Sequence, residues 1–196
     1  MTTHSVDLIE ADRMALVLID IQERLAAAMR DEDRARVVDR CIKLARVAAL
    51  VGAPIIVTRQ YPKGLGPVVP ELERPLETLT DQGVDIRVVD KVAFCCASEP
   101  DFEETLRATG RRQIVLAGME THICVAQTAL ALGAQGTTVH VAADACCSRE
   151  SLAHGIALDR MRAGGITVSH SESVMYEAVG VAGTERFKSL LTIVKE

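Results

Sequence analysis

The sequence has 196 residues, of which 48% are hydrophobic, and a formal net charge of −5 at pH 7. This length and hydrophobic content fit a single domain, residues 1–196, with a core large enough for independent stability. Because nucleic acids and anionic membrane surfaces are negatively charged, the net charge argues against both as partners. We therefore expect a small-molecule substrate.

The six cysteines are too few in a chain of this length to indicate a disulfide scaffold. The adjacent pairs Cys95–Cys96 and Cys146–Cys147 lack the C-x-x-C spacing of a zinc site, so they predict no metal site. Residues 1–13 contain no basic segment typical of a signal peptide, and the apolar run 14–19 is much shorter than the ~20 residues of a membrane span. We expect a cytoplasmic protein in a reducing compartment.

The apolar run 14–19 shows no alternation, which is typical of a central strand covered on both faces. Asp20 follows directly. It is either the N-cap of the next helix or a general base at the carboxyl end of a parallel strand, where open α/β sheets bind their ligands. The pattern of apolar residues predicts a helix over 32–51 that ends at Gly52, and then a strand over 55–58. These elements predict a right-handed βαβ unit.

Four of the chain's six prolines lie in the segment 60–83. Because proline interrupts regular structure, this segment is predicted to be a long loop, with at most a short helix around 76–79. Such a loop is typically functional or an oligomer contact. Tyr61 within it is either part of a pocket or a surface aromatic residue.

The remaining segments continue the alternation of strands and helices. A partly alternating strand is predicted over 85–90, as expected at a sheet edge, and Lys91 follows it directly. Further strands are predicted over 137–143 and 166–168, together with a helix over 151–163 whose Ile156 and Met161 face inward. An amphipathic helix over 184–194 closes the chain. This order predicts a three-layer α/β/α sandwich with a parallel sheet.

The stretch 113–130 is predicted to form a buried strand over 114–117, a turn at Gly118 and a helix that begins near Thr121. Cys124 would then lie in the first helical turn. Unpaired N–H groups and the positive end of the helix dipole there lower the pKa of a thiol and can bind an oxyanion. The alternative is that Cys124 is a small hydrophobic side chain that fills space under the helix.

Asp20, Lys91 and Cys124 follow three different predicted strands. Because the carboxyl ends of parallel strands share one edge of a sheet, we expect the three side chains to converge there. A carboxylate that accepts the thiol proton and a lysine that stabilises the resulting charges form a pattern for nucleophilic catalysis.

Three segments resemble the isochorismatase-like cysteine hydrolases, a superfamily that includes nicotinamidases and N-carbamoylsarcosine amidases. They are Leu18–Gln22, Asp90–Phe94 and Gly118–Val125, and their order and spacing extend the resemblance over nearly the whole chain. Residues 58–66 and 139–143 further resemble the subgroup of isochorismatase domain-containing proteins.

The resemblance implies a Rossmann-like sheet of six parallel strands in the order 3-2-1-4-5-6, and a catalytic triad of Asp20, Lys91 and Cys124. It also implies a cis peptide bond between Met119 and Glu120, and an oxyanion hole formed by the N–H groups of Glu120 and Cys124. In that strand order the third strand lies about 10 Å from the first, so Lys91 must reach inward to meet Asp20.

The activity that the resemblance implies is hydrolysis of an amide-like C–N bond of a small molecule through a thioester. Nicotinamidases carry an Asp and two His as metal ligands after the second strand, whereas Arg59–Pro62 contains no histidine, so we expect neither a metal nor a cofactor. The alternatives are an isochorismatase-type vinyl ether hydrolase, which needs no cysteine, and a non-catalytic oligomeric binding or scaffold protein.

Four further residues are candidates for lining the substrate pocket: Gln22, Tyr61, Phe94 and His122. For His122, a place on the surface or at a subunit contact is an equal alternative. The proline-rich segment and an alanine-rich chain with 3% aromatic residues favour a homo-oligomer, either a dimer or larger.

Overall fold

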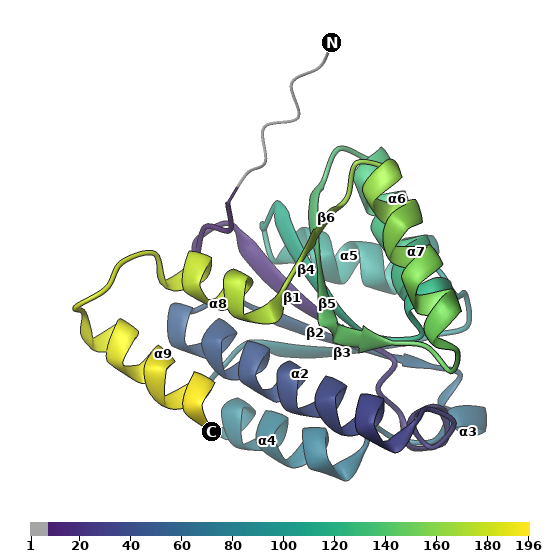
Figure 1. Ribbon diagram of the computed structural model, residues 1–196, viewed down its shortest axis with the longest axis horizontal. Helices are drawn as coiled ribbons and strands as arrows, with labels where there is room; N and C mark the ends of the chain where they lie inside the picture. Colours follow the sequence, from purple (N-terminus) through teal and green to yellow (C-terminus); the bar gives the residue numbers. More distant parts are fainter. Residues whose placement is uncertain (1–7) are drawn as a thin grey trace.

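The computed structural model describes residues 8–196, so residues 1–7 of the segment considered for targeting lie outside it. Its centre is a sheet of six parallel strands in the order β3-β2-β1-β4-β5-β6 (Figure 1). The predicted fold class and strand order are therefore confirmed. The strands are β1 (Met14–Ile19), β2 (Ile55–Gln60), β3 (Ile86–Lys91), β4 (Gln113–Met119), β5 (Thr138–Cys147) and β6 (Thr167–Ser169).

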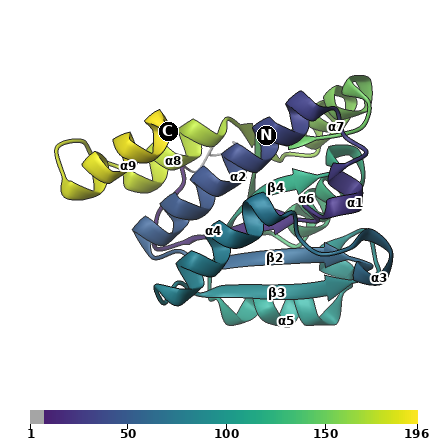
Figure 2. The ribbon, with the colours of Figure 1, turned by 90° about the horizontal axis from the view of Figure 1, so that it is seen from below.

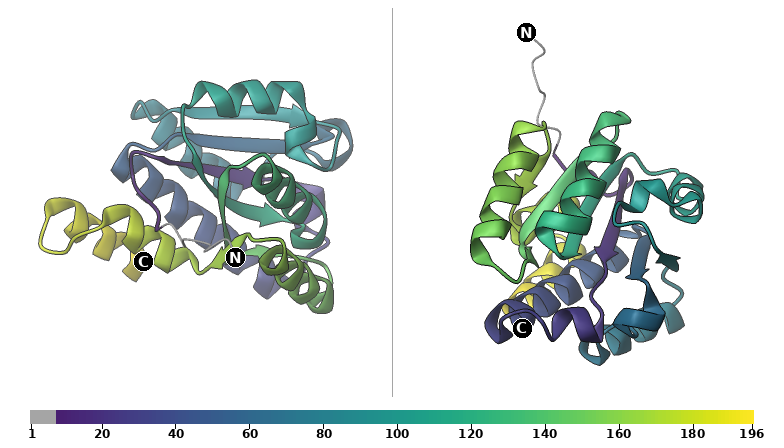
Figure 3. Two further views of the ribbon diagram at one scale, coloured as in Figure 1. Left: turned by 90° about the horizontal axis from the view of Figure 1, so that it is seen from above. Right: turned by 90° about the vertical axis from the view of Figure 1, so that its right-hand side faces the viewer.

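Helices cover both faces of this sheet. One face carries α2 (Asp31–Val51), α4 (Pro70–Asp81), α8 (Ser171–Val179) and α9 (Glu185–Lys195), and the other carries α5 (Pro100–Ala108), α6 (Ala126–Ala134) and α7 (Ser151–Ala163). Figure 2 shows α2 and α4 on one side of the strands and α5 on the other, and Figure 3 shows α6 beside α7. None of the helices within residues 8–196 is long and apolar enough to cross a membrane.

The continuous apolar run of β1 follows from this layering. Leu16 and Leu18 pack into the core under α2, whereas the alternate residues Ala15, Val17 and Ile19 pack into the core under α5 and α6. All six residues of the strand are buried. A strand between two cores has no polar face, which is why its sequence lacks alternation.

The prediction of a long loop over 60–83 was wrong. Strand β2 extends to Gln60, a short helix α3 (Pro62–Leu65) follows, and α4 occupies twelve residues. Leu72, Leu76 and Leu79 repeat at helical spacing on the buried face of α4. Proline is tolerated in the first turn of a helix. Pro75 lies further along and cannot donate a backbone hydrogen bond, and burial of the leucine stripe offsets the cost of that missing bond.

The helix predicted over 151–163 is confirmed as α7, but one of its two inward-facing residues was assigned wrongly. Met161 is fully buried, whereas the side chain of Ile156 lies on the surface, with 59% of the residue exposed. The buried residues of α7 are Ala157, Leu158 and Met161, so the buried face of this helix does not include Ile156. Strand β5 also extends beyond its predicted end at residue 143, as far as Cys147.

Candidate active site

Three strand ends bring Asp20, Lys91 and Cys124 to one edge of the sheet. Asp20 directly follows β1 and adopts a left-handed backbone conformation with φ 54°, and Lys91 is the last residue of β3. Cys124 lies in a π-helical turn, Thr121–Val125, between β4 and α6. The relative exposures of Asp20, Lys91 and Cys124 are 0%, 3% and 4%, so all three are screened from bulk water.

Asp20 and Lys91 form a buried ion pair, with 2.8 Å between Oδ2 and Nζ and no exposed surface on either side chain. The second carboxylate oxygen, Oδ1, accepts a 2.7 Å hydrogen bond from the Thr58 hydroxyl on β2. Lys91 thus reaches across the intervening strand to Asp20. Burial is the largest single effect and disfavours the charged form of Lys91. The negative charge of Asp20, the hydrogen bond to it and the nearby thiols of Cys96 and Cys124 together outweigh burial and raise the pKa of Lys91.

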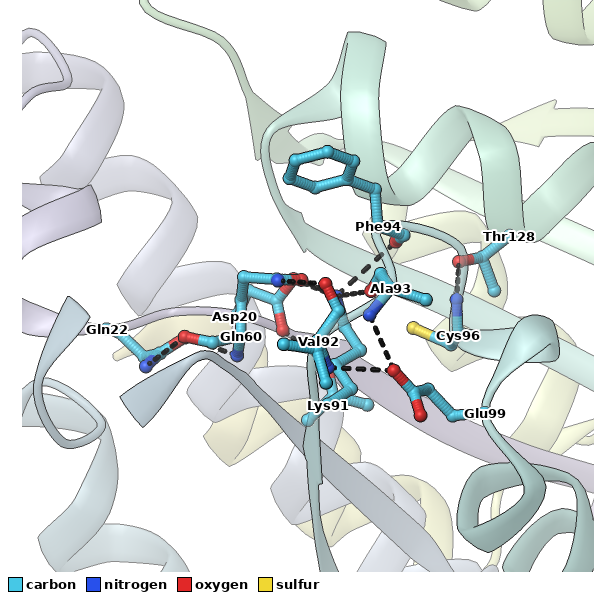
Figure 4. Close-up of polar contacts among 11 residues, drawn as sticks. Asp20, Gln22, Gln60, Lys91, Val92, Ala93, Phe94, Cys96, Glu99 and Thr128 are labelled. Atoms are coloured by element: carbon cyan, nitrogen blue, oxygen red, sulfur yellow. Dashed lines mark hydrogen bonds and ion pairs between the residues drawn. The ribbon is translucent and has the colours of Figure 1, made fainter. Parts of the chain in front are cut away.

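The ammonium group of Lys91 has three further oxygen partners. Nζ donates to Gln60 Oε1 at 2.5 Å, and to the carbonyls of Ala93 at 3.2 Å and Phe94 at 3.4 Å. All four partners are acceptors, which suits a protonated amine because NH₃⁺ carries only donors. Figure 4 shows these contacts, with the Phe94 ring pointing away from the ion pair.

The Cys124 thiol lies beside this ion pair, and its pKa is raised rather than lowered. Burial is the main cause, the negative charge of Asp20 and a thiol–Asp20 hydrogen bond add to it, and the positive charge of Lys91 opposes it. The expectation of a lowered thiol pKa was therefore wrong, because burial and the charge of Asp20 together raise it. A protonated thiol needs a base, and Asp20 is adjacent.

Met119 and Glu120 connect β4 to the π-helical turn. The peptide bond between them is cis, and both residues are buried. The Glu120 carboxylate accepts hydrogen bonds from the backbone N–H of Arg149 at 2.9 Å and from Arg149 Nε at 3.1 Å. These contacts tie the start of the π-helical turn to the connection between β5 and α7.

Of the four predicted pocket residues, Gln22 and His122 are tied to other parts of the chain. The Gln22 amide is fully buried and bonded to backbone groups of Gln60 and Gly66, so it joins segments rather than lining open space. His122 is partly buried, with Nδ1 2.9 Å from the Ser148 hydroxyl.

The other two, Tyr61 and Phe94, lie at the surface, with relative exposures of 54% and 56%. Their rings are therefore not buried with Asp20 and Lys91. Both contribute through the backbone instead: the Tyr61 N–H donates to the Lys91 carbonyl at 2.8 Å, and the Phe94 carbonyl accepts from Lys91 Nζ.

Sequence reasoning missed three residues of this site: Thr58, Gln60 and Cys96. Thr58 and Gln60 are two positions apart near the carboxyl end of β2, so their side chains share one face, and this spacing was the available signal. The Cys96 thiol is buried near Lys91 and Asp20, and burial raises its pKa to about 11. Across residues 8–196, no three His, Cys, Asp or Glu side chains are grouped to hold a metal ion.

The chain is similar to known proteins over most of its length. The family model of the isochorismatase domain matches residues 14–173. Isochorismatase domain-containing protein 2 from Bos taurus is 36% identical over 182 residues, which cover 92% of this chain and 82% of the relative.

Two solved structures have a similar fold over almost the full chain. The MAR1 ribonuclease from Caenorhabditis elegans superposes with a TM-score of 0.85 and 30% identity, covering 97% of this chain and 93% of that one. The YcaC gene product from Escherichia coli, described as an octameric hydrolase of unknown specificity, has a TM-score of 0.84 and 25% identity, covering 95% and 90%.

Proposed function

The chain belongs to the isochorismatase family of hydrolases, and on that premise we propose that it is a cysteine-dependent hydrolase of amide-like C–N bonds in small molecules. The single observation that supports this proposal is the buried Asp20–Lys91 ion pair beside the buried Cys124 thiol. A fixed carboxylate next to a thiol whose proton must be removed is the arrangement of a general base and its nucleophile.

In the proposed mechanism, Asp20 accepts the thiol proton as the Cys124 sulfur attacks the substrate carbonyl. The N–H groups of Glu120 and Cys124 are assigned to the oxyanion, and each such donor is worth about 3–4 kcal/mol in comparable sites. Asp20 then gives the proton to the leaving amine, which leaves a thioester on Cys124. Water, deprotonated by Asp20, attacks the thioester, releases the carboxylic acid and restores the thiol.

Lys91 is assigned an electrostatic role in both half-reactions. Its ammonium faces only acceptors and its pKa is raised, so it remains charged while Asp20 alternates between its two protonation states. A fixed positive charge stabilises the ionised carboxylate and the negative charge that develops on the Cys124 sulfur.

The alternative functions differ in whether they require the Cys124 thiol. An isochorismatase-type vinyl ether hydrolase needs Asp20 but not Cys124, and a scaffold protein needs neither. The similarity to a protein named as a ribonuclease raises RNA as a substrate, but the net charge of −5 at pH 7 disfavours binding a polyanion. We further propose a homo-oligomer, in keeping with the octameric relative.

The test is a panel of small primary amides and carbamoyl compounds, with amine release measured and the acid-quenched protein analysed by peptide mass mapping. We expect release of amine and an acyl adduct on the Cys124 peptide, both lost in Cys124→Ala and kept in Cys95→Ala, a variant of a more exposed free cysteine. Turnover that survives Cys124→Ala would contradict the thioester mechanism. Absence of both turnover and adducts would favour the scaffold alternative.

A further inference from the structure

The ammonium group of Lys91 is held by two side chains on two different strands. One is Asp20 after β1, at 2.8 Å, and the other is Gln60 at the end of β2, at 2.5 Å. Gln60 is the residue of β2 that stands in register with Lys91 of β3. The lysine side chain must cross β2 to reach Asp20, so Gln60 is the β2 residue placed to guide it.

The Gln60 amide has only one orientation that satisfies its neighbours. Nε2 donates a 2.7 Å hydrogen bond to the carbonyl of Val92, and this leaves Oε1 facing the ammonium of Lys91. The reverse orientation would place NH₂ against NH₃⁺ and an amide oxygen against a carbonyl oxygen. The side chain therefore presents a fixed acceptor, itself 7% exposed, to the lysine (Figure 4).

The backbone of Gln60 is held in turn by Gln22, two residues after Asp20. The Gln60 N–H donates to Gln22 Oε1 at 2.7 Å, and Gln22 Nε2 donates to the Gln60 carbonyl at 3.1 Å and to the Gly66 carbonyl at 2.7 Å. Both residues are buried. Two amide side chains thus connect the segment after β1, the end of β2 and the lysine at the end of β3.

We propose that Gln60 is a positioning residue that keeps the Lys91 ammonium charged and fixed against Asp20, and that Gln22 holds Gln60 in place for this. The catalytic consequence rests on the proposed function, because it acts through Lys91 on Asp20 and Cys124. The effect on Lys91 itself does not depend on any activity, which allows the two ideas to be tested separately.

The experiment is NMR of the full-length protein with ¹³C-labelled lysine, following the Cε signals from pH 7 to 12. The chain has five lysines, and Lys91→Met identifies the signal of Lys91. The variants are Gln60→Met, which removes the acceptor, and Gln60→Asn, whose shorter side chain withdraws the oxygen while keeping a polar amide. Gln60→Glu keeps an oxygen in place, and Gln135→Met changes an exposed glutamine outside the site.

We expect the Lys91 titration midpoint to fall by about one pH unit in Gln60→Met and Gln60→Asn, because a charge-assisted hydrogen bond to the protonated form is lost. Gln60→Glu and Gln135→Met should keep the high midpoint. A folded Gln60→Met or Gln60→Asn protein whose Lys91 titrates as in the wild type would overturn the proposal. If Gln60→Met does not fold, Gln60→Asn decides.

The amide panel on the same variants separates this inference from the proposed function. If the proposed function holds, Gln60→Met lowers kcat while KM changes little, and Gln60→Glu restores part of kcat. If the wild type and Cys124→Ala are equally inactive but the Lys91 midpoint still falls in Gln60→Met, the positioning role stands and the proposed function fails.

Discussion

Asp20 and Lys91 act on the Cys124 thiol in opposite directions. The charge of Asp20 raises the pKa of the thiol and the charge of Lys91 lowers it. In Asp20→Asn the opposing charge disappears and Lys91 remains. We expect the pH midpoint for alkylation of Cys124 by iodoacetamide to move down by about 1 to 3 pH units, as expected for a neighbouring charge.

The same variant should lose hydrolysis although its thiol is easier to ionise. Without a carboxylate to protonate the leaving amine, turnover of an amide should fall by about 10²- to 10⁴-fold. Rates of alkylation from pH 7 to 12, mapped by mass spectrometry across the cysteines, and amine release by unmodified protein measure the two effects. A midpoint that stays unchanged or rises would mean that Asp20 does not act on the thiol.

Thr58 affects stability as well as the position of Asp20. In Thr58→Val the buried Oδ1 of Asp20 loses its 2.7 Å hydrogen bond, and the loss of a hydrogen bond to a buried carboxylate is costly. We expect the free energy of unfolding to fall by about 1–3 kcal/mol, measured by urea denaturation. Thr78→Val, whose exposed hydroxyl bonds within α4, is the control and should change stability little.

The turn after β3 depends on a single carboxylate at the start of α5. Glu99 Oε1 accepts hydrogen bonds from the N–H groups of Val92, at 2.7 Å, and Ala93, at 2.5 Å, and so fixes the turn that supplies two carbonyls to Lys91. The bonds from Ala93 and Val92 lower the pKa of Glu99 in the folded protein.

Because the folded-state pKa is depressed, the stability that Glu99 contributes is present above its ordinary pKa of 4.5 and is lost as the pH falls through the lower folded value. In Glu99→Gln the side chain does not titrate, so this pH-dependent contribution to the free energy of unfolding is absent. We expect the wild type to lose more stability than Glu99→Gln between pH 6 and pH 3, measured by denaturant titration at each pH. Parallel losses in the two proteins would show that Glu99 does not hold the turn.

The sequence made the strand ends predictable but not the contacts between them. Asp20 directly follows β1 and Lys91 is the last residue of β3, so the parallel sheet alone brings them to one edge. Gln60 was missed because the prolines of its segment predicted a loop. The structure instead forms α4 in that segment, with a stripe of leucines on its buried face. The formation of α4 and the raised pKa of Cys124 both depend on burial in the folded protein, which local sequence patterns do not describe.

At the level of the whole molecule, α7 links the π-helical turn that carries Cys124 to an apolar surface. Its inner side holds the π-helical turn through the Thr121 hydroxyl, 2.9 Å from His154 Nδ1. On its outer side, Leu152 is 73% exposed and Ile156 is 59% exposed, one helical turn apart. Two large aliphatic residues at this spacing on an exposed helix face suit burial against a second copy of the chain.

If α7 is a subunit contact in the proposed homo-oligomer, a charge at its centre should weaken assembly, because burying an unpaired carboxylate is costly. We expect Ile156→Glu to shift the sedimentation coefficient towards smaller species, while Gln82→Glu at the exposed end of α4 leaves it unchanged. An Ile156→Glu protein that sediments as the wild type would place the subunit contact elsewhere. Because the same helix contacts the turn that carries Cys124, the proposed function predicts that the dissociated variant also turns over amides more slowly, without change in the Lys91 titration.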